Sequence, residues 1–176
     1  AHGIFAADMD GDGDIDIISA SETDDKIAWY ENDGAANPTF AYASIATTAD
    51  EASDIQVADV DGDGDLDIIS ASEADDTIAW YINDGAKDPT WTAVDIATNA
   101  DGAMNVDVGD IDGDGDLDIV SASIYDNTIA WYENQGAAGN HLLTMADEYV
   151  RAEDIPGGGA TITVNLSAAA KRDITV

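Results

Sequence analysis

The sequence predicts an all-β protein built from tandem repeats, and three observations lead to this fold class. A nine-residue acidic motif occurs three times at an interval of 51 residues, beginning at Asp8, Asp59 and Asp110. A tryptophan recurs at the same interval, as Trp29, Trp80 and Trp131. The segments between these landmarks are short, rich in β-branched residues and free of helical periodicity. A period of about 50 residues with four antiparallel strands is typical of propeller blades, so we expect tandem four-stranded blades of a β-propeller.

Each unit is expected to contain four short strands. The acidic motif forms the loop between the first and second strands, and Asn-Asp-Gly (Asn-Gln-Gly in the third unit) marks the turn between the third and fourth. The expected strands are 3–7, 54–58 and 105–109 for the first position, 16–21 for the second, 26–31 for the third, and 39–45 and 90–96 for the fourth.

The repeated tryptophan lies in the third strand of each unit. Alternation places Ile27 and Trp29 on one face of the sheet and Ala28 and Tyr30 on the other. We expect the tryptophan to lie in the core between adjacent blades. The alternative is that it stacks against a sugar.

The acidic motif has the spacing of an oxygen-rich cation site. Aspartates at relative positions 1, 3, 5 and 9 direct carboxylate oxygens to one side of a tightly curled loop, and position 7 faces the same point with a backbone carbonyl. Glycine at position 6 permits the sharp turn that such a loop requires. Several hard oxygen ligands in a flexible arrangement suit calcium, whereas magnesium demands a stricter octahedron and keeps more water. We therefore expect three calcium loops.

An acidic, glycine-rich run can also be an ordinary solvated turn. Five carboxylates within nine residues repel one another, however, at roughly 1 kcal/mol per pair about 5 Å apart in water. An ordinary solvated turn gains nothing from five closely spaced carboxylates. Three copies of the motif at a fixed interval therefore favour a bound cation. An EF-hand is excluded because position 12 is Ser19, Ser70 or Ser121 rather than glutamate, and because predicted strands flank the loop.

The amino-acid composition limits the kinds of partner that the protein is expected to bind and the surroundings in which it is expected to work. The chain has 176 residues, no cysteine, and 38 acidic against five basic residues, for a net charge of −33. Such a surface repels nucleic acid and anionic lipid, so no nucleic-acid partner is expected. Life in salty water would explain a similar acidic excess. No apolar run approaches the roughly 18 residues of a membrane span, and the first residue already lies within the repeat pattern, so the natural N-terminus is expected upstream.

The sequence Ala-Asp-Val-Asp-Gly-Asp-Gly-Asp-Leu-Asp-Ile, followed by Ile-Ala-Trp-Tyr-x-Asn-Asp-Gly, resembles the FG-GAP (VCBS-type) repeat. The resemblance covers residues 1 to about 138. The family includes the calcium-bearing blades of the integrin α-subunit propeller and many secreted bacterial proteins. The Phe-Gly and Gly-Ala-Pro motifs of the family match this sequence poorly, so the resemblance to integrin extends only to the calcium loop and the blade.

This resemblance implies an extracellular protein, secreted or at the cell surface, with about three calcium ions per chain. It also implies metal ligands at loop positions 1, 3, 5, 7 (by its carbonyl) and 9. In this sequence those positions are Asp8, Asp10, Asp12, Asp14 and Asp16, then Asp59, Asp61, Asp63, Asp65 and Asp67, and finally Asp110, Asp112, Asp114, Asp116 and Asp118.

The repeat pattern ends after Gly136. We expect repeats at 1–50, 51–101 and 102–139, with a fourth strand of the third repeat extending to 150 as an alternative. Residues 140–159 are expected to be a linker or an edge strand. Two alternating segments after the glycine run at 157–159 resemble the opening of a Calx-β sandwich, so 160–176 is expected to be a β segment and part of such a module.

No catalytic set emerges from the sequence, and we expect no enzyme activity. His2 and His141 lie outside the repeated motifs, and calcium accounts for each dense carboxylate cluster. The leading hypothesis is a calcium-stabilised β-repeat module for adhesion, binding, or extracellular surface or filament assembly, with an extracellular protein or a glycan as ligand. The alternatives are a carbohydrate-binding, lectin-like propeller and a non-catalytic arm of a large secreted enzyme. Three blades are fewer than the four to eight of a closed ring, so we expect an incomplete ring whose open strand edges mediate self-association.

Overall fold

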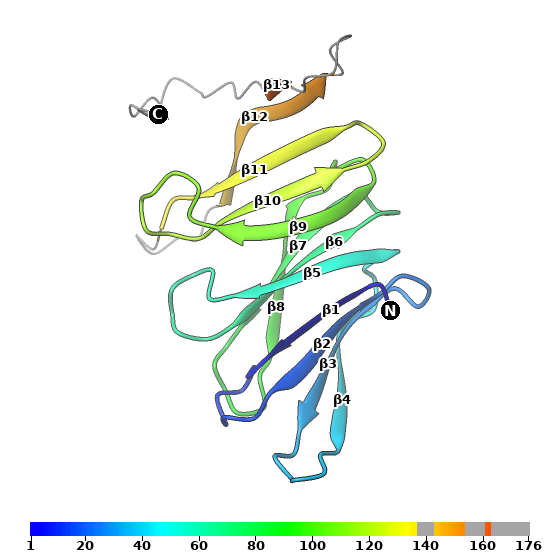
Figure 1. Cartoon of the computed structure of the whole chain (residues 1–176), viewed down its shortest axis with the longest axis vertical. Helices are drawn as coiled ribbons and strands as arrows, with labels where there is room; N and C mark the ends of the chain where they lie inside the picture. The colour runs from blue at the N-terminus through cyan, green and yellow to red at the C-terminus, as the bar shows by residue number, and fades with distance from the viewer. Residues whose placement is uncertain (137–142, 154–160, 163–176) are drawn as a thin grey trace.

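The computed structural model describes residues 1–136, 143–153 and 161–162. These residues form strands and connecting loops, without a helix among them, in three antiparallel sheets that follow one another along the long axis (Figure 1). In this part of the chain there is accordingly no helix with the length and apolar character needed to cross a membrane. The all-β class and the antiparallel repeat units are confirmed. That these units are blades of a β-propeller, arranged as an incomplete ring, stays a prediction.

Each sheet contains one repeat, with its strands side by side in sequence order, and we name the sheets blade 1, blade 2 and blade 3. Blade 1 consists of β1 (Gly3–Ala7), β2 (Asp16–Ser21), β3 (Lys26–Asn32) and β4 (Phe40–Ala46). Blade 2 consists of β5 (Ala52–Ala58), β6 (Asp67–Ser72), β7 (Thr77–Asn83) and β8 (Trp91–Ala97). Blade 3 consists of β9 (Ala103–Gly109), β10 (Asp118–Ser123), β11 (Thr128–Asn134) and β12 (Leu143–Glu153), with the two-residue β13 (Thr161–Ile162) paired to β12.

The strand boundaries differ from the predicted ones by one residue at β3, β4 and β8 and by two residues at two first strands. Strands β5 and β9 begin at Ala52 and Ala103, two residues before the expected starts at 54 and 105. Both alanines are buried, because small side chains at these positions pack into the cores between blades. The sequence pattern missed this extension because alanine carries a weak strand signal on its own.

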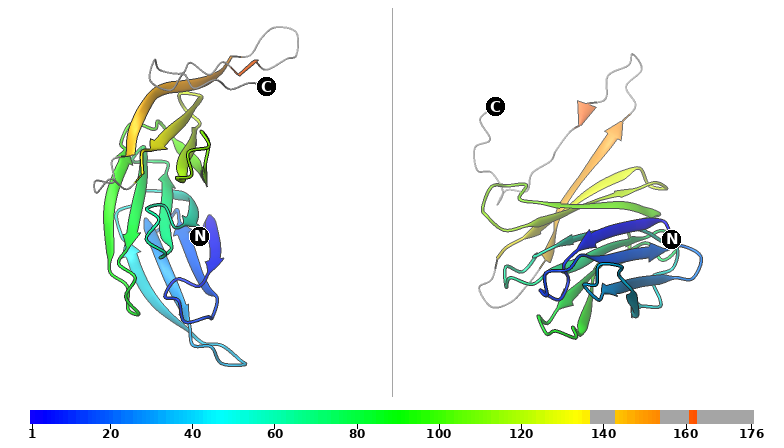
Figure 2. Two further views of the ribbon diagram at one scale, coloured as in Figure 1. Left: turned by 90° about the vertical axis from the view of Figure 1, so that its left-hand side faces the viewer. Right: turned by 60° about the horizontal axis from the view of Figure 1, so that its bottom comes forward.

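The fourth strand of blade 3 is β12, which pairs antiparallel with β11. It therefore holds the place that β4 and β8 hold in the other blades (Figures 1 and 2). Of the segment 160–176, compared above with a Calx-β module, residues 160 and 163–176 lie outside the described residues.

Each blade presents two faces, because successive side chains of a strand point to opposite sides. We name them after the aromatic residues of the third strand. The Trp face is the one to which Trp29, Trp80 or Trp131 belongs. The Tyr face is the one to which Tyr30, Tyr81 or Tyr132 belongs.

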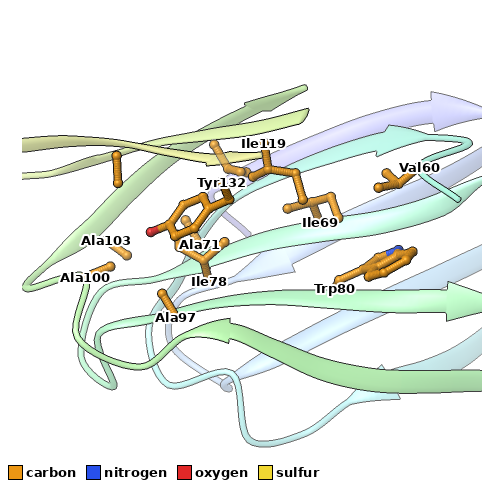
Figure 3. Packing of buried hydrophobic residues seen from close by; sticks show 12 residues of the cluster. Val60, Ile69, Ala71, Ile78, Trp80, Ala97, Ala100, Ala103, Ile119 and Tyr132 are labelled. Atoms are coloured by element: carbon orange, nitrogen blue, oxygen red, sulfur yellow. The ribbon is translucent and has the colours of Figure 1, made fainter. Parts of the chain in front are cut away.

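Adjacent blades pack with the Trp face of one against the Tyr face of the next. Between blades 1 and 2, the larger contributors are Ile18, Ile27 and Trp29 from the Trp face and Ile55, Ile68 and Tyr81 from the Tyr face. Between blades 2 and 3, they are Ile69, Ile78 and Trp80 against Val106, Ile119 and Tyr132 (Figure 3). Full burial of such side chains stabilises by about 1.5–3 kcal/mol each, so these two cores hold the blades together.

Blade 2 is covered on both faces, and all six residues of β6 are buried. The prediction that the tryptophans lie between blades is confirmed for Trp29 and Trp80. Trp131 lies on the outward Trp face of blade 3 and is half-buried.

Polar contacts fix the spacing between blades. The Asn83 side-chain amide donates hydrogen bonds to the Leu66 carbonyl of its own blade (3.0 Å) and to the Met9 carbonyl of blade 1 (3.1 Å). Asn134 repeats this arrangement with the carbonyls of Leu117 (3.1 Å) and Val60 (2.8 Å). One amide in each interface therefore ties the acidic loops of two adjacent blades together.

Candidate metal centres

The three acidic loops join the first and second strands of each blade. In the first loop, Gly11 and Gly13 adopt positive φ angles of 72° and 96°, which L-residues with a side chain rarely adopt. A Cβ at either position would meet nothing within 4 Å, so the requirement for glycine is conformational rather than steric. The loop curls back on itself as predicted, with a second glycine at position 4 assisting the one at position 6.

This curl brings the carboxylates together. In blade 1, Asp8, Asp10 and Asp12 each offer an oxygen, and these oxygens lie within 4.8 Å of one another. Blade 2 repeats the cluster with Asp59, Asp61 and Asp63, and blade 3 forms one from Asp110, Asp112 and Asp118. The structure thus assembles loop positions 1, 3 and 5 twice, and positions 1, 3 and 9 once.

Backbone N–H groups hold these carboxylates in place. Asp8 accepts hydrogen bonds from the N–H groups of Asp12 (3.1 Å) and Gly13 (2.9 Å). Asp10 accepts from Asp12 (3.2 Å), and Asp12 in turn accepts from Asp14 (2.9 Å). These hydrogen bonds hold the carboxylates close together, so little further ordering would be needed to bind an ion.

Two carboxylate oxygens are left without a hydrogen bond. Asp10 Oδ2 and Asp59 Oδ1 are shielded from solvent and accept no hydrogen bond. Burial also raises the pKa of the Asp10 carboxyl, and the charges of Asp12, Asp16 and Asp8 raise it further. A shielded, unpaired carboxylate oxygen is costly, and a cation at the cluster would remove that cost.

The aspartates at position 9 have a second role that sequence reasoning missed. Asp16 is buried; its Oδ1 accepts the N–H of Asn32 at the end of β3 (2.8 Å), and its Oδ2 accepts the N–H of Met9 (3.1 Å). The same pair of bonds recurs in the other two blades, at Asp67 and Asp118. This aspartate therefore links the loop to the third strand of its blade. In the sequence, the constant spacing of 16 residues between the aspartate and the asparagine could have indicated this contact.

Burial has an electrostatic consequence at this position. It raises the pKa of Asp67 to about 6, although hydrogen bonds from the Asn83 N–H and the Trp80 side chain oppose the rise. The pKa of Asp118 is raised for the same main reason. Both carboxyls are ones that a nearby cation would help to keep ionised.

The aspartates at position 7 turn away from the cluster. The Asp14 carboxylate lies against Gly34, where a Cβ would come within 2.1 Å of Oδ2, and Asp65 and Asp116 lie in the same way against Gly85 and Gly136. A side chain at these glycines would have to displace the carboxylate, and the positive φ angles of 66° at Gly34 and Gly85 and 68° at Gly136 also favour glycine. That position 7 ligates through its carbonyl stays a prediction, and the outward side chain agrees with it.

The donor set fits calcium. Every group brought together in these clusters is a carboxylate, and hard oxygen ligands in number are what calcium prefers. The cluster residues would hold the ion, whose chemistry here would be to neutralise and cross-link the loop. Nitrogen and sulfur ligands, which suit zinc or copper, do not contribute to these clusters.

A second candidate site is a groove of about 390 Å³ between blades 1 and 2, lined among others by Thr47, Asp75, Thr77 and Asp95. Asp75 Oδ1 in this groove is shielded and accepts no hydrogen bond, and burial raises the pKa of its carboxyl. The volume is within the range of small-molecule sites. Of the histidines, His2 contacts the Ser53 carbonyl across the blade interface (2.7 Å), and His141 lies outside the described residues.

Comparison with known families supports the repeat assignment. A family model described as an FG-GAP-like repeat matches residues 8–70 and again residues 59–121. The two matches are offset by one repeat and each runs from one acidic loop past the next. No curated protein and no solved structure matches the chain.

Proposed function

The chain belongs to the FG-GAP-like repeat family, and from this premise we propose that it is a calcium-stabilised β-repeat module that acts by binding, in adhesion or assembly outside the cell. The observation that carries the proposal is the set of three carboxylate clusters at equivalent places in three blades. The shielded, unpaired oxygens of Asp10 and Asp59 support it further.

Calcium would act as a structural ion in this proposal. An ion held by Asp8, Asp10 and Asp12 would cross-link a loop that Asp16 already ties to β3. Each ion would also add two positive charges to a chain whose net charge is −33, which reduces self-repulsion. Extracellular modules commonly bind calcium with dissociation constants near 10⁻⁴ to 10⁻³ M, so the sites would be filled outside the cell and largely empty in the cytosol.

Thermal unfolding with and without calcium tests this role. At a calcium concentration about a hundredfold above the dissociation constant, each site would add about 2.7 kcal/mol to the free energy of unfolding. We expect chelation to lower the melting temperature sharply, and magnesium to restore it poorly. The variant Asp63→Ala should lose part of the calcium-dependent shift, while Asp88→Ala, which removes an equal charge from an exposed loop, should keep all of it. A melting temperature indifferent to chelation would contradict the proposal.

A carbohydrate-binding module is the second candidate, favoured by the groove with its shielded Asp75 oxygen. Small-molecule clefts hold a ligand with a few well-placed polar groups, and Asp75, Asp95 and Thr77 supply carboxylates and a hydroxyl in this groove. A glycan array with the wild-type chain and Asp75→Ala separates the candidates. Glycan binding that Asp75→Ala abolishes favours the carbohydrate-binding module, and the absence of any glycan signal removes it.

We also propose that the chain has no catalytic activity of its own. The alternative, in which the chain is a non-catalytic arm of a larger secreted enzyme, also requires no catalytic activity of this chain. The sequence of the full-length gene would test it, by showing whether a catalytic domain is encoded beside these repeats. Self-association through open strand edges is part of the proposed role in assembly.

A further inference from the structure

We propose that the groove between blades 1 and 2 binds an amino sugar, with the protonated amine of the sugar held between Asp75 and Asp95. The proposal deepens the second candidate function, because the choice of a sugar rests on the carbohydrate-binding module proposed above. The amine is argued separately, from a comparison of blade 1 with blade 2. This comparison concerns residues 51 positions apart, which are equivalent in the repeat.

Blade 1 already holds an ammonium group at the equivalent place. The Lys26 ammonium lies 3.0 Å from Oδ2 of Asp24, and this hydrogen bond raises the pKa of Lys26. The ammonium also interacts electrostatically with the hydroxyls of Tyr42 and Tyr30. In blade 1, therefore, a carboxylate near tyrosine hydroxyls holds a primary amine that the chain itself supplies.

Blade 2 keeps the carboxylate but lacks the amine. Asp75 is the equivalent of Asp24, whereas Thr77 takes the position of Lys26. Of the described residues that line the groove, none is a lysine, an arginine or a histidine. A carboxylate that is paired with an ammonium in blade 1 therefore faces the groove in blade 2 without one.

The space for a ligand comes from a small side chain on the fourth strand. In blade 1, Tyr42 lies opposite Tyr30, but in blade 2 the residue opposite Tyr81 is Ala93. Alanine in place of tyrosine leaves room beside the third strand, and Ala93 lines the groove. The volume of about 390 Å³ is enough for a small molecule.

A second carboxylate faces the same groove. Asp95 stands where blade 1 has Ser44, and it lies opposite Ala79, on the same face of the sheet as Tyr81. Burial raises the pKa of Tyr81, and the charges of Asp75 and Asp95 raise it further, so both carboxylates act on this hydroxyl. Two like charges in one groove repel each other, and a protonated amine between them would relieve the repulsion.

The interface between blades 2 and 3 shows which polar groups the groove leaves unsatisfied. There, Asp126 Oδ1 accepts a backbone N–H (3.0 Å), and Ser121 Oγ lies 3.2 Å from the Tyr132 hydroxyl. One repeat earlier, the equivalent oxygens, Asp75 Oδ1 and Ser70 Oγ, are shielded from solvent and have no hydrogen-bond partner. Shielded, unpaired polar groups are costly. Their occurrence in this interface, and not one repeat later, indicates that a polar ligand completes it.

The other polar residues of the groove favour a sugar over the alkyl stem of a lysine. Four side chains with hydroxyl groups line it: Thr47, Thr48, Ser72 and Thr77. Each hydroxyl can both donate and accept a hydrogen bond, as the ring hydroxyls of a sugar can. An alkyl chain offers no such partners.

Calorimetry with matched oligosaccharides tests the proposal on the full chain, in saturating calcium and about 0.15 M salt, which screens non-specific attraction to the acidic surface. The probes are a glucosamine oligomer and an N-acetylglucosamine oligomer of the same length, in which the amine is acetylated and uncharged. We expect the glucosamine oligomer to bind at least about tenfold more tightly, because only its amine forms charge-assisted hydrogen bonds with the carboxylates.

Four variants locate the binding. Asp75→Asn and Asp95→Asn keep the shape of the groove and remove one charge each, so each should weaken glucosamine binding at least about tenfold. Asp88→Asn removes an equal charge from an exposed loop and should bind like wild type. Thr77→Lys restores the ammonium that Lys26 supplies in blade 1, and it should abolish binding by filling the site. Melting temperatures check that each variant is folded.

The possible results separate this proposal from the one on which it rests. If both oligomers bind equally and Asp75→Asn abolishes both, the amine is wrong while the carbohydrate-binding module stands. If neither oligomer binds, both proposals fail. Glucosamine binding that the Asp75→Asn and Asp95→Asn variants leave unchanged would be attraction to the acidic surface and would overturn the proposal. A lysine tetrapeptide that binds in the groove more tightly than the glucosamine oligomer would overturn the choice of a sugar.

Discussion

Blades 1 and 2 have almost the same pattern of residues, yet the same positions lie in opposite environments. Ile4 and Ile55 are equivalent residues of equivalent strands, and one is 74% exposed while the other is 1% exposed. The difference comes from the neighbours, because blade 2 lies between two blades and blade 1 has a described neighbour on one face. In a stacked repeat protein, the local sequence determines the structure of each blade. The position of the blade in the stack determines how much each residue contributes to the free energy of unfolding.

The largest contrast is expected between two tryptophans. Trp80→Ala should lower the free energy of unfolding by about 3–5 kcal/mol, because it opens a cavity in the core between blades 2 and 3. Trp131→Ala removes a half-buried side chain from an outward face and should cost less than half as much. Urea unfolding at low protein concentration, where copies do not associate, measures both. Equal losses would mean that the outward face of blade 3 is covered in solution.

The second-largest difference in the free energy of unfolding is expected between two equivalent isoleucines, Ile55 and Ile4. Ile55→Ala is expected to cost about 2–5 kcal/mol in the same measurement, since the side chain is buried among Ile68 and Tyr81. Ile4→Ala should change the free energy of unfolding by no more than about 0.5 kcal/mol.

The asparagine pair tests the polar contact between blades. Asn83→Ala removes hydrogen bonds to Leu66 and Met9 in a buried setting and should cost about 1–3 kcal/mol. Asn32→Ala removes two exposed hydrogen bonds, one donated to the Ile15 carbonyl and one accepted from the Gly34 N–H, and no bond between blades. The expected loss is therefore about half as large or smaller. A double variant of Asn83 and Asn134 should show nearly additive losses, because the two interfaces are separate.

The smallest contrast concerns the turn before the fourth strand. Hydrogen bonds from the Thr39 side chain and N–H lower the pKa of Asp33, and Thr90 does the same for Asp84. Because the pKa is lowered in the folded state, the ionised aspartate stabilises each turn at pH values above 3.8, the ordinary pKa of the group. This stabilisation is lost as the pH falls below 3.8 and through the lowered pKa. Blade 3 has Gln135 at this position and should not show the effect. Carboxyl titration by NMR should give values below 3.8 for both aspartates, and higher values would contradict the assignment.

Much of this architecture could be predicted from the sequence. The alternation in Ile-Ala-Trp-Tyr set the third strand and its two faces, and the spacing of the acidic motif set the loops. Two features could not be predicted. The hydrogen bond between Asp16 and Asn32 depends on two strands meeting in the folded sheet. The constant spacing of 16 residues marks the two positions but does not show that their atoms bond. The exposure of Ile4 depends on which blades surround it, and this is a property of the stack rather than of the repeat.

The most direct test of the calcium proposal is a calorimetric calcium titration of the wild-type chain and of Asp12→Ala, Asp63→Ala and Asp112→Ala, each of which removes one member of a different carboxylate cluster. The wild type should bind three ions, one for each carboxylate cluster. Each variant should bind one ion fewer, while the remaining two sites keep their affinity, because the loops belong to different blades. A wild-type chain that binds no calcium, or a single substitution that empties all three sites, would contradict the account.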